Sequence, residues 1–358
     1  MTSSKKKVIV GMSGGVDSSA AAALLLEQGY EVTGAFMKNW SETKDPKTGE
    51  CAWQQERRDA MEVAAQLGVP FMTFDFEKEY DEAVVKYLYR EYEAGRTPNP
   101  DVMCNRAVKF DLFLKEALKL GADFIATGHY ARVSEEGGRY RLLAGLDRNK
   151  DQSYFIFSLG QDQLKHVLFP IGHLDKHDVR AYARDKGLST ADKKDSQGIC
   201  FIGKVEMKEF LSRAIPPKPG AIVTVEGKEV GRHDGVAAFT VGQRHGLGVG
   251  GGTPYYVVEK DVVSGTVTVA EGADHPALYK DRLTAEGWTW VSGEAPKLPL
   301  ACKARIRYRQ PLQGCEVRAT DESGILEVVF GDRQRAVTPG QFVVLYQDDE
   351  VLGGGVIR

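Results

Sequence analysis

The fold of this chain is decided by the stretch Lys7-Val8-Ile9-Val10-Gly11-Met12-Ser13-Gly14-Gly15-Val16-Asp17-Ser18-Ser19. Its apolar residues 8–10 predict a buried strand, and the alanine- and leucine-rich residues 20–28, closed by Gly29, predict a helix. A glycine-rich turn between a strand and a helix leaves backbone N–H groups unpaired at the positive end of the helix dipole. The stretch therefore predicts an anion site, in which residues 11–18 bind phosphate groups.

The same loop indicates how the phosphates are used. A Walker A loop carries a lysine before its Ser or Thr, and this loop has none. A lysine on the β and γ phosphates supports γ-phosphoryl transfer, whereas a loop that binds pyrophosphate as a unit suits cleavage between the α and β phosphates. We therefore expect ATP as the ligand and pyrophosphate as the leaving group. The alternative is an ordinary turn in which Asp17 or Ser18 caps the helix.

Strand and helix patterns alternate along the first two hundred residues. Further strands are predicted at residues 31–37, 71–76 and 123–127, with helices at 59–67 and 80–93. Such repeated units imply a parallel sheet with helices on both faces, and ligands bind at the carboxyl ends of its strands. The glycine-rich loop and residues 128–129 both follow a strand, so both are expected at that edge.

The pattern changes after about residue 205. Three prolines within residues 215–220 predict a linker, and short β-rich runs follow at 221–225, 255–259 and 266–270. Period-two alternation at 302–308, 315–319, 325–330 and 341–346 predicts a small antiparallel barrel. We therefore expect an α/β chain with three parts: a Rossmann-like parallel-sheet domain at 1–207, a small β-rich central domain at 208–280 and a C-terminal antiparallel β-barrel at 281–358.

Composition excludes several classes of protein. With 358 residues, 42% hydrophobic and 27% charged, the chain is neither collagen-like, nor disordered, nor a disulfide-dense mini-domain. No apolar run approaches the roughly 20 residues of a membrane span, and the opening residues resemble a first strand more than a signal peptide, so we expect a cytoplasmic location and no membrane partner. The net charge of −3 gives no global sign of nucleic-acid binding, although a local basic face stays open.

Two of the five cysteines lie in strings that favour chemistry. Cys104 is expected in a turn before a helix that starts near residue 107, with Arg106 close by, and both features lower a thiol pKa. Cys200 lies in the turn-rich residues 195–203. A single cysteine is more often a small buried apolar residue, but two in polar turns beside an ATP-activating loop reverse that expectation. Cys51, Cys302 and Cys315 carry no motif and are expected to be structural.

Together these strings resemble the tRNA-specific 2-thiouridylases of the PP-loop ATP pyrophosphatase superfamily. The similar strings run the length of the chain: residues 11–18, 99–101, 104–105, 126–130, 150–155, 198–203, 239–244 and 307–310. The resemblance implies ATP-dependent 2-thiolation of the wobble uridine, U34, of tRNA. It implies nucleotide contacts by Gly11, Met12, Ser13, Gly14, Gly15, Val16, Asp17, Ser18, Met37 and Gly128.

The resemblance also implies a division of labour in the reaction. The C2 oxygen of the uridine attacks the α phosphate of ATP, and adenylation turns a poor leaving oxygen into AMP. Cys200 supplies sulfur from a persulfide, loaded by a sulfur-relay protein that a cysteine desulfurase feeds, and Cys104 is the partner nucleophile. Either Cys104 attacks the persulfide to release sulfide, or the terminal sulfur attacks C2 directly; both routes leave a Cys104–Cys200 disulfide that a reductant reopens. The implied substrates are the glutamate, glutamine and lysine tRNAs.

Several polar residues are candidates for substrate contacts. Chemistry at C2 needs an unstacked base, and Asn99, Pro100 and Asp101 are placed to bind it, although Asp101 could equally cap a helix. His129 contacts RNA or only satisfies the end of a strand. Asp17 holds Mg²⁺ or caps its helix.

Basic and amide side chains give a second group of candidates. Lys150, Asp151 and Gln152 offer phosphate and base contacts, or form a solvated loop. Arg305, Arg307 and Arg309, with Lys303 in phase, are expected on one strand face as a basic stripe for RNA phosphates, or as an ordinary solvated face. The resemblance adds Tyr308 and Gln341 as tRNA contacts.

Two other functions are weighed against this one. An amide-forming synthetase of the same superfamily would adenylate a carboxylate and would not use paired reactive cysteines. An RNA-binding module without catalysis is disfavoured by the intact loop. Iron–sulfur ligation by Cys51, Cys104 and Cys200 is open on residue type, but their wide separation gives no ligand pattern.

Overall fold

A computed structural model describes residues 5–44, 49–195, 207–250 and 252–358. The first part of the chain forms a five-stranded parallel sheet in the order β3-β2-β1-β4-β7. Its strands are β1 (Lys7–Gly11), β2 (Glu31–Lys38), β3 (Phe71–Asp75), β4 (Phe124–Thr127) and β7 (Val167–Leu168). The predicted parallel sheet is confirmed, and the order places the carboxyl ends of β1 and β4 side by side.

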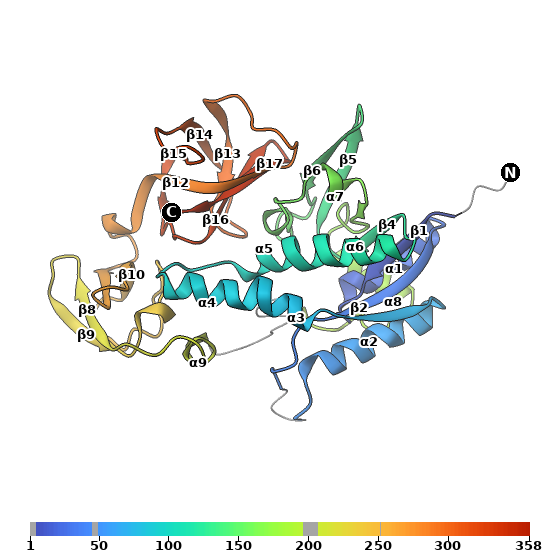
Figure 1. The fold of residues 1–358 in the computed structure, drawn as a ribbon, viewed down its shortest axis with the longest axis horizontal. Helices are drawn as coiled ribbons and strands as arrows, with labels where there is room; N and C mark the ends of the chain where they lie inside the picture. Colours follow the sequence, from blue (N-terminus) through green and yellow to red (C-terminus); the bar gives the residue numbers. More distant parts are fainter. Residues whose placement is uncertain (1–4, 45–48, 196–206, 251) are drawn as a thin grey trace.

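Helices cover both faces of this sheet because β1 alternates between two apolar cores. Val8 and Val10 pack in one core with α1 (Val16–Glu27), α2 (Ala52–Leu67) and α8 (Lys176–Asp185). Ile9 faces the other core, which the chain from residue 77 to 119 covers. The predicted two-faced α/β arrangement is therefore confirmed (Figure 1).

Two long helical runs form that second face, and each contains a π-helical segment. The first comprises α3 (Glu77–Tyr80), η1 (Asp81–Val85) and α4 (Lys86–Glu93). The second comprises α5 (Pro100–Cys104), η2 (Asn105–Leu112) and α6 (Phe113–Lys119). π-Helical turns are rare and are frequently found at functional sites. The shorter helical pieces nearby are η3 (Ser153–Phe155) and α7 (Gln161–Leu164).

The central part forms a separate four-stranded sheet in the order β10-β11-β8-β9. Its strands are β8 (Gly220–Thr224), β9 (Glu229–His233), β10 (Tyr255–Asp261) and β11 (Thr266–Glu271). Ile222, Val257 and Val267 are fully buried in its small core. Short helices accompany it: α9 (Met207–Ser212), η4 (Val236–Ala238) and η5 (Pro276–Leu278). The central β-rich domain is confirmed.

The last part forms the expected antiparallel barrel, because β12 pairs with both β15 and β17. Its strands are β12 (Tyr279–Trp290), β13 (Leu300–Arg305), β14 (Gln313–Ala319), β15 (Leu326–Arg335), β16 (Phe342–Gln347) and β17 (Glu350–Ile357). Figure 1 shows the barrel and the central sheet at one end of the molecule and the parallel sheet at the other.

One hairpin crosses the domain boundary that the sequence predicts at residue 207. The strands β5 (Ala131–Glu136) and β6 (Arg139–Ala144) lie in the first part of the chain. They nevertheless extend the barrel's sheet, since β6 pairs with β17. Arg132 forms an ion pair with Asp349, and Arg141 forms one with Glu350 at 2.6 Å. The first and last parts of the chain therefore share one continuous sheet.

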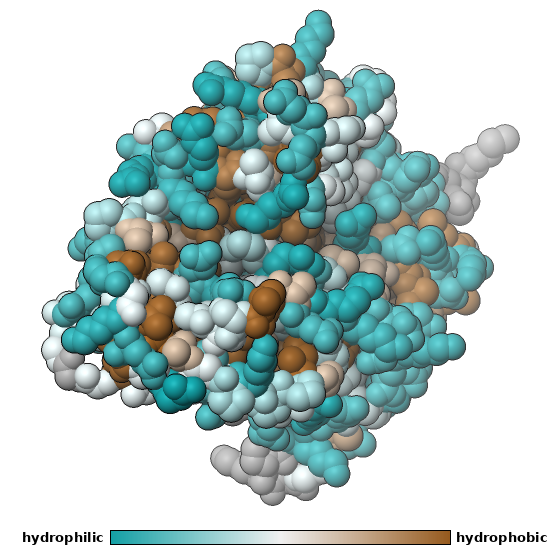
Figure 2. All heavy atoms as spheres, turned by 60° about the vertical axis from the view of Figure 1, so that its left-hand side comes forward, coloured by the Kyte–Doolittle hydropathy of each residue, from teal (hydrophilic) through white to brown (hydrophobic). Residues whose placement is uncertain are grey.

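Hydrophilic side chains cover most of the face in Figure 2, and hydrophobic side chains show between them in separate groups. In the parts of the chain that the structure describes, no helix has both the length and the apolar character to cross a membrane.

Candidate functional site

The glycine-rich loop opens α1 with its backbone uncovered. Gly15 is the N-cap residue, and no side chain among the described residues caps this helix, so the alternative of an ordinary turn capped by Asp17 or Ser18 is wrong. Ser18 Oγ instead accepts from the Ser13 N–H at 3.1 Å and donates to the Gly15 carbonyl at 3.1 Å. The helix start is thus left open to an anion, as the first turn of a helix favours.

Two glycines allow the backbone around this helix start to come close together. Gly14 has a φ of 71°, and a Cβ there would lie 2.3 Å from the Glu56 carbonyl oxygen. A Cβ at Gly128 would lie 2.6 Å from the Ser18 nitrogen. The ends of β1 and β4 therefore meet, as the strand pattern predicts, and any larger residue at Gly128 would push them apart.

Asp17 has partners that the sequence did not predict. Lys176 Nζ donates to its two carboxylate oxygens at 2.7 and 2.8 Å, and the Tyr130 hydroxyl donates at 2.8 Å. Burial, followed by the charge of Asp17, raises the pKa of Tyr130, so its hydroxyl stays protonated as a donor. Lys176 is only 13% exposed. A nearly buried cation therefore stands beside the loop, placed there by the first residue of α8.

Further cations surround the same helix start. Lys193 Nζ donates to the Gly14 carbonyl at 2.8 Å and pairs with Asp59. Asp195 joins the group, accepting from Lys150 at 2.6 Å, from Arg180 at 2.8 Å and from Lys176 at 2.9 Å. Although burial raises the pKa of Asp195, the hydrogen bonds from Lys150 and Lys176 lower it to about 2. Lys176 and Lys193 are therefore the cations that contact the loop directly, and each is also paired with a carboxylate.

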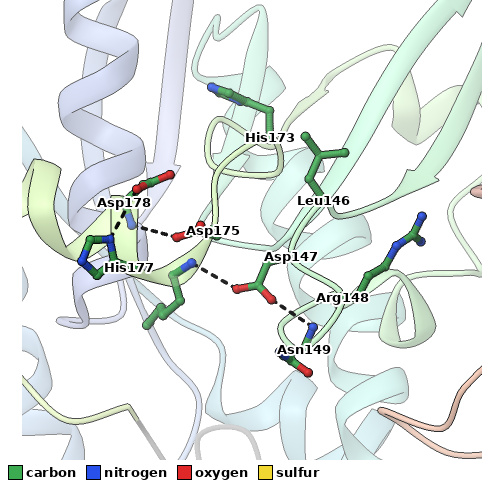
Figure 3. Close-up of a pocket in the computed structure, with 9 residues that line it drawn as sticks. Leu146, Asp147, Arg148, Asn149, His173, Asp175, His177 and Asp178 are labelled. Atoms are coloured by element: carbon green, nitrogen blue, oxygen red, sulfur yellow. Dashed lines mark hydrogen bonds and ion pairs between the residues drawn. The ribbon is translucent and has the colours of Figure 1, made fainter.

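A hollow of about 630 Å³ lies beside α8 and is lined by both sides of the turn that carries Lys176 (Figure 3). Asp147 supports this turn, because its carboxylate accepts from the Lys176 backbone N–H at 3.1 Å and from that of Asn149 at 2.9 Å. Asp175 caps α8 by accepting from the Asp178 N–H at 2.9 Å. The hollow is thus lined by the same turn residues that hold Lys176 in position at the start of α8.

Cys104 lies in a different setting from the one that the sequence predicts. Asn99 caps α5 by accepting from the Val102 N–H at 3.3 Å, so the helix begins at Pro100 and not near residue 107. Cys104 is the last residue of α5 and is fully buried, so its placement in a polar turn is wrong. Cys200 and the string around it, residues 196–206, lie outside the described residues. The pairing of the two cysteines therefore stays a prediction.

Asn99 and Gln341 meet although they are far apart in sequence. Gln341 Nε2 donates to the Thr97 carbonyl at 2.8 Å and to the Pro98 carbonyl at 3.1 Å. Its Oε1 accepts from Asn99 Nδ2 at 3.4 Å. Asp101 lies in the first turn of α5, and the expectation that it caps the helix is wrong because Asn99 does so. Two candidate substrate residues, one from the first domain and one from the barrel, are thus in contact.

His129 occupies the end of a strand, as one of its two interpretations requires. Its Nδ1 lies 2.7 Å from Thr127 Oγ1, and its ring packs against Phe110 and Phe169. Burial lowers its pKa well below the ordinary value, so the ring is neutral. With 7% exposure, the ring is accessible to RNA only if its surroundings move.

Asp151 itself fits neither of the two interpretations given for residues 150–152. The residue is 1% exposed and is therefore neither solvated nor able to contact a substrate in this conformation. It accepts from the Gly145 and Ser153 N–H groups, each at 3.0 Å, and pairs with Arg305 at 3.1 Å. Gln152 accepts from the Tyr130 N–H at 3.1 Å, and Lys150 keeps partial exposure.

The predicted basic stripe is wrong, because β13 ends at Arg305. Arg305 is buried against Asp151, and Arg309 has a φ of 63°, which breaks the alternation. Arg307 Nη2 donates to the Ala336 carbonyl at 2.6 Å, and burial lowers its pKa. Tyr308 packs on Phe155 with ring centroids 4.6 Å apart. Arg305 and Arg307 therefore join parts of the chain together, and the exposed Arg309 lies over its neighbour Tyr308, so the three do not form one exposed face.

Comparisons with known proteins agree with this three-part structure. Residues 6–204 match the family described as a tRNA methyl transferase HUP domain, residues 208–271 its PRC-barrel domain and residues 280–357 the aminomethyltransferase beta-barrel domain. The tRNA-specific 2-thiouridylase MnmA 2 of Geobacillus kaustophilus is 53% identical to this chain, over 98% of it and 94% of the relative. This chain belongs to the tRNA-specific 2-thiouridylase family.

A second 2-thiouridylase, from Bacillus subtilis, is 51% identical over 98% of this chain and 94% of its own length. Among solved structures, a 4-thiouridine synthetase in complex with RNA and bound ATP matches 55% of this chain and 45% of its own at 21% identity. Its TM-score of 0.37 is too low to support an argument. In this 2-thiouridylase the loop residues, Gly128 and the buried Met37 are brought together, since a Cβ on Gly11 would lie 3.1 Å from Met37 Cε.

Proposed function

We propose that this chain catalyses ATP-dependent 2-thiolation of the wobble uridine, U34, of tRNA. The observation that carries the proposal is the uncovered start of α1, closed in by Gly14 and Gly128 and flanked by Lys176 and Lys193. It belongs to a chain that is 53% identical to a protein named as a 2-thiouridylase. ATP is the activating substrate and tRNA is the acceptor, and we place the activity in the cytoplasm, where tRNA is modified.

In the first step the uridine C2 oxygen attacks the α phosphate of ATP and expels pyrophosphate. The backbone N–H groups at the start of α1 bind the phosphates, with the helix dipole in support. Lys176 and Lys193 stand on either side of the loop and stabilise the negative charge that gathers on the leaving pyrophosphate. This step needs no lysine inside the loop itself.

In the second step sulfur replaces the adenylated oxygen, and AMP leaves. Cys200 carries the sulfur as a persulfide, delivered by a sulfur-relay protein fed by a cysteine desulfurase, and Cys104 is the partner nucleophile. The persulfide sulfur, one oxidation level above a thiol, is released at the level of sulfide, and Cys104 and Cys200 are left as a disulfide that a thiol reductant reopens. Because Cys104 is fully buried, residues 97–104 must move before its sulfur reaches the base.

Mg²⁺ binding is one of the two interpretations given for Asp17, and the contacts of this residue do not fit that role. Both of its carboxylate oxygens accept from Lys176, and one also accepts from Tyr130. A metal ion bound to Asp17 would have to displace the Lys176 ammonium group, which already neutralises the carboxylate. We therefore assign no step to a metal at Asp17.

The region around α5 is the proposed base-binding surface. Asn99, Pro100 and Asp101 begin the helix that carries Cys104, and Gln341 holds the segment before it. Lys150 pairs with Asp195 beside the glycine-rich loop, and Tyr308 packs on Phe155. Both side chains are partly exposed, and we propose them as contacts to tRNA phosphate and base. The glutamate, glutamine and lysine tRNAs are the proposed substrates.

The experiment uses the purified full-length chain with unmodified tRNA, ATP and a sulfide donor. We expect AMP, pyrophosphate and 2-thiouridine in equal amounts, and no product with a tRNA that carries cytidine at position 34. Cys200→Ser leaves the glycine-rich loop unaltered, so this variant should keep tRNA-dependent ATP–pyrophosphate exchange. It should form no 2-thiouridine when the sulfur is supplied by a protein persulfide.

Two outcomes would reject the proposal. If exchange depends on a carboxylate substrate and not on tRNA, the chain is an amide-forming synthetase. If tRNA binds but every tRNA fails to stimulate exchange, the chain is an RNA-binding module without catalysis.

A further inference from the structure

Cys302 and Cys315, which the sequence assigned no role, face each other across two strands. The register of β13 and β14 pairs Cys302 directly with Cys315, and their Sγ atoms lie 3.7 Å apart. Both side chains lie at the edge of the barrel core and are partly exposed to solvent. The two thiols are therefore held together by a fixed register and remain within reach of small molecules.

Their spacing is close to that of a disulfide. Residues directly opposite on antiparallel strands have Cβ atoms about 4.5–5.5 Å apart, and a disulfide needs about 3.5–4.5 Å with its sulfurs at about 2.05 Å. Small side-chain rotations within the existing pair close most of the gap between the sulfurs. No change of strand register is needed.

The contact between the two sulfurs also changes the pKa of each thiol. A hydrogen bond from Cys315 lowers the pKa of Cys302. The hydrogen bond to Cys302 and burial raise the pKa of Cys315. Cys302 is thus the more acidic thiol of the pair, and Cys315 keeps its proton more readily.

The pair closes the base of the hairpin that carries Arg307 and Tyr308. Only two register pairs, Lys303 with Gly314 and Ala304 with Gln313, separate the cysteines from the connecting residues 306–312. That connection packs on the first domain through Tyr308 and Phe155, and the Phe155 carbonyl accepts from Asn105, the neighbour of Cys104, at 3.4 Å. A covalent link at the base would therefore hold a loop that reaches toward the Cys104 helix.

We propose that Cys302 and Cys315 form a reversible disulfide with a low-molecular-weight disulfide as the oxidant, and that this bond clamps the β13–β14 hairpin. The Cys302 thiolate attacks one sulfur of the oxidant and expels one thiolate, giving a mixed disulfide. The Cys315 thiolate then attacks the Cys302 sulfur and expels the second thiolate. Two electrons pass to the oxidant, and the two protons from the protein thiols end on the released small thiols.

The test uses the full-length chain with Cys51, Cys104 and Cys200 replaced by serine, so that Cys302 and Cys315 are its only thiols. After equilibration with reduced and oxidised glutathione and quenching with an alkylating agent, intact mass should show a species lighter by two hydrogen atoms and carrying no alkyl group. Adding Cys315→Ser should stop the reaction at the mixed disulfide with glutathione. Limited alkylation should label Cys302 before Cys315.

The same bond is checked in the unaltered chain, where peptide mapping after oxidation should recover the peptides of residues 302 and 315 cross-linked to each other. Hydrogen exchange of residues 306–312 should slow severalfold in the oxidised protein. Two separate mixed disulfides, or no oxidation at any glutathione ratio, would overturn the disulfide, and unchanged exchange would overturn the clamp. Neither readout uses ATP or tRNA, so a failure here is distinct from a failure of the proposed function.

Discussion

Gly14 is the residue on which the shape of the loop depends most directly. Its φ of 71° lies in the left-handed region, and a Cβ there would meet the Glu56 carbonyl oxygen at 2.3 Å. We expect Gly14→Ala to destabilise the protein by about 1–3 kcal/mol through backbone strain alone, with loss of ATP-dependent activity. Urea unfolding and the thiolation assay measure the two effects.

Gly15 provides the matched control for that variant. Its φ of −104° suits any residue, and the nearest contact of an added Cβ is Ser13 Oγ at 3.5 Å. Gly15→Ala should therefore lower stability by at most about 1 kcal/mol. Equal destabilisation by the two alanines would show that the left-handed backbone at Gly14 is not the cause.

Lys176 supplies the cation next to the loop, so its charge should matter for ATP. We expect Lys176→Met to lower kcat/KM for ATP about 100-fold, the effect of removing one group that stabilises developing charge. Binding of tRNA should be unchanged, because the lysine faces Asp17 and Asp195. Lys186→Met is the control, since this lysine pairs with Glu27 on the surface just beyond the same helix. An unaltered kcat/KM for ATP in Lys176→Met would contradict the role.

The sequence could not show this lysine, although it showed the loop beside it. The loop is local, and its glycines, hydroxyls and flanking hydrophobic runs lie within a few residues of one another. Lys176 reaches Asp17 across 159 residues of chain. In the sequence, Asp175 and Lys176 look like the capped start of any surface helix. Long-range ion pairs are set by the fold, so only the structure reveals them.

At the scale of the elements, short apolar runs predicted the strands of the parallel sheet, which has an apolar core on each side. The strands β1, β2, β3 and β4 were found because each has an apolar run followed by glycine or polar residues. The strand expected at 302–308 was too long, because the Gln310 side chain accepts from the Ile306 N–H at 2.8 Å and turns the chain back. The hairpin of β5 and β6 was not predicted, although Gly137-Gly138 between its strands is a turn signal.

The contact between β10 and α4 gives a prediction for pH. Lys260 donates to the Phe239 carbonyl at 2.6 Å and lies over the Tyr92 ring, and burial lowers its pKa to about 8. Between about pH 8 and 10.5 the unfolded chain holds this proton and the folded chain does not, so stability rises with pH. Relative to Lys260→Met, the wild type should gain up to about 3 kcal/mol across this window.

Urea unfolding of the wild type and of Lys260→Met at pH 7.5 and at pH 10 measures the difference between their free energies of unfolding at each pH. Effects of the substitution that do not depend on pH change the difference between the two proteins by a constant amount, so only the titration of Lys260 gives that difference a slope with pH. A difference that stays constant with pH, or that moves in favour of the methionine variant, would show that Lys260 titrates normally.

At the scale of the whole molecule, Arg305 and Asp151 join the barrel to the first domain. They form a 3.1 Å ion pair with side chains only 6% and 0% exposed. Arg305→Met leaves a buried carboxylate without its partner, and we expect it to lower the unfolding free energy by about 3–5 kcal/mol. Combining it with Asp151→Asn should restore part of that loss. Purely additive effects in this double-mutant cycle would mean that the pair contributes no coupling between the two parts.

The hairpin of β5 and β6 determines how the separately expressed domains of this chain should behave. Its strand β6 is covered on one side by β17, which lies more than two hundred residues later. A fragment that stops at residue 207 would bare that strand's unpaired N–H and C=O groups, and a barrel expressed alone would lose its neighbour in the same way. Each half should therefore self-associate when produced separately, and mixing the two should restore the association state of the intact chain.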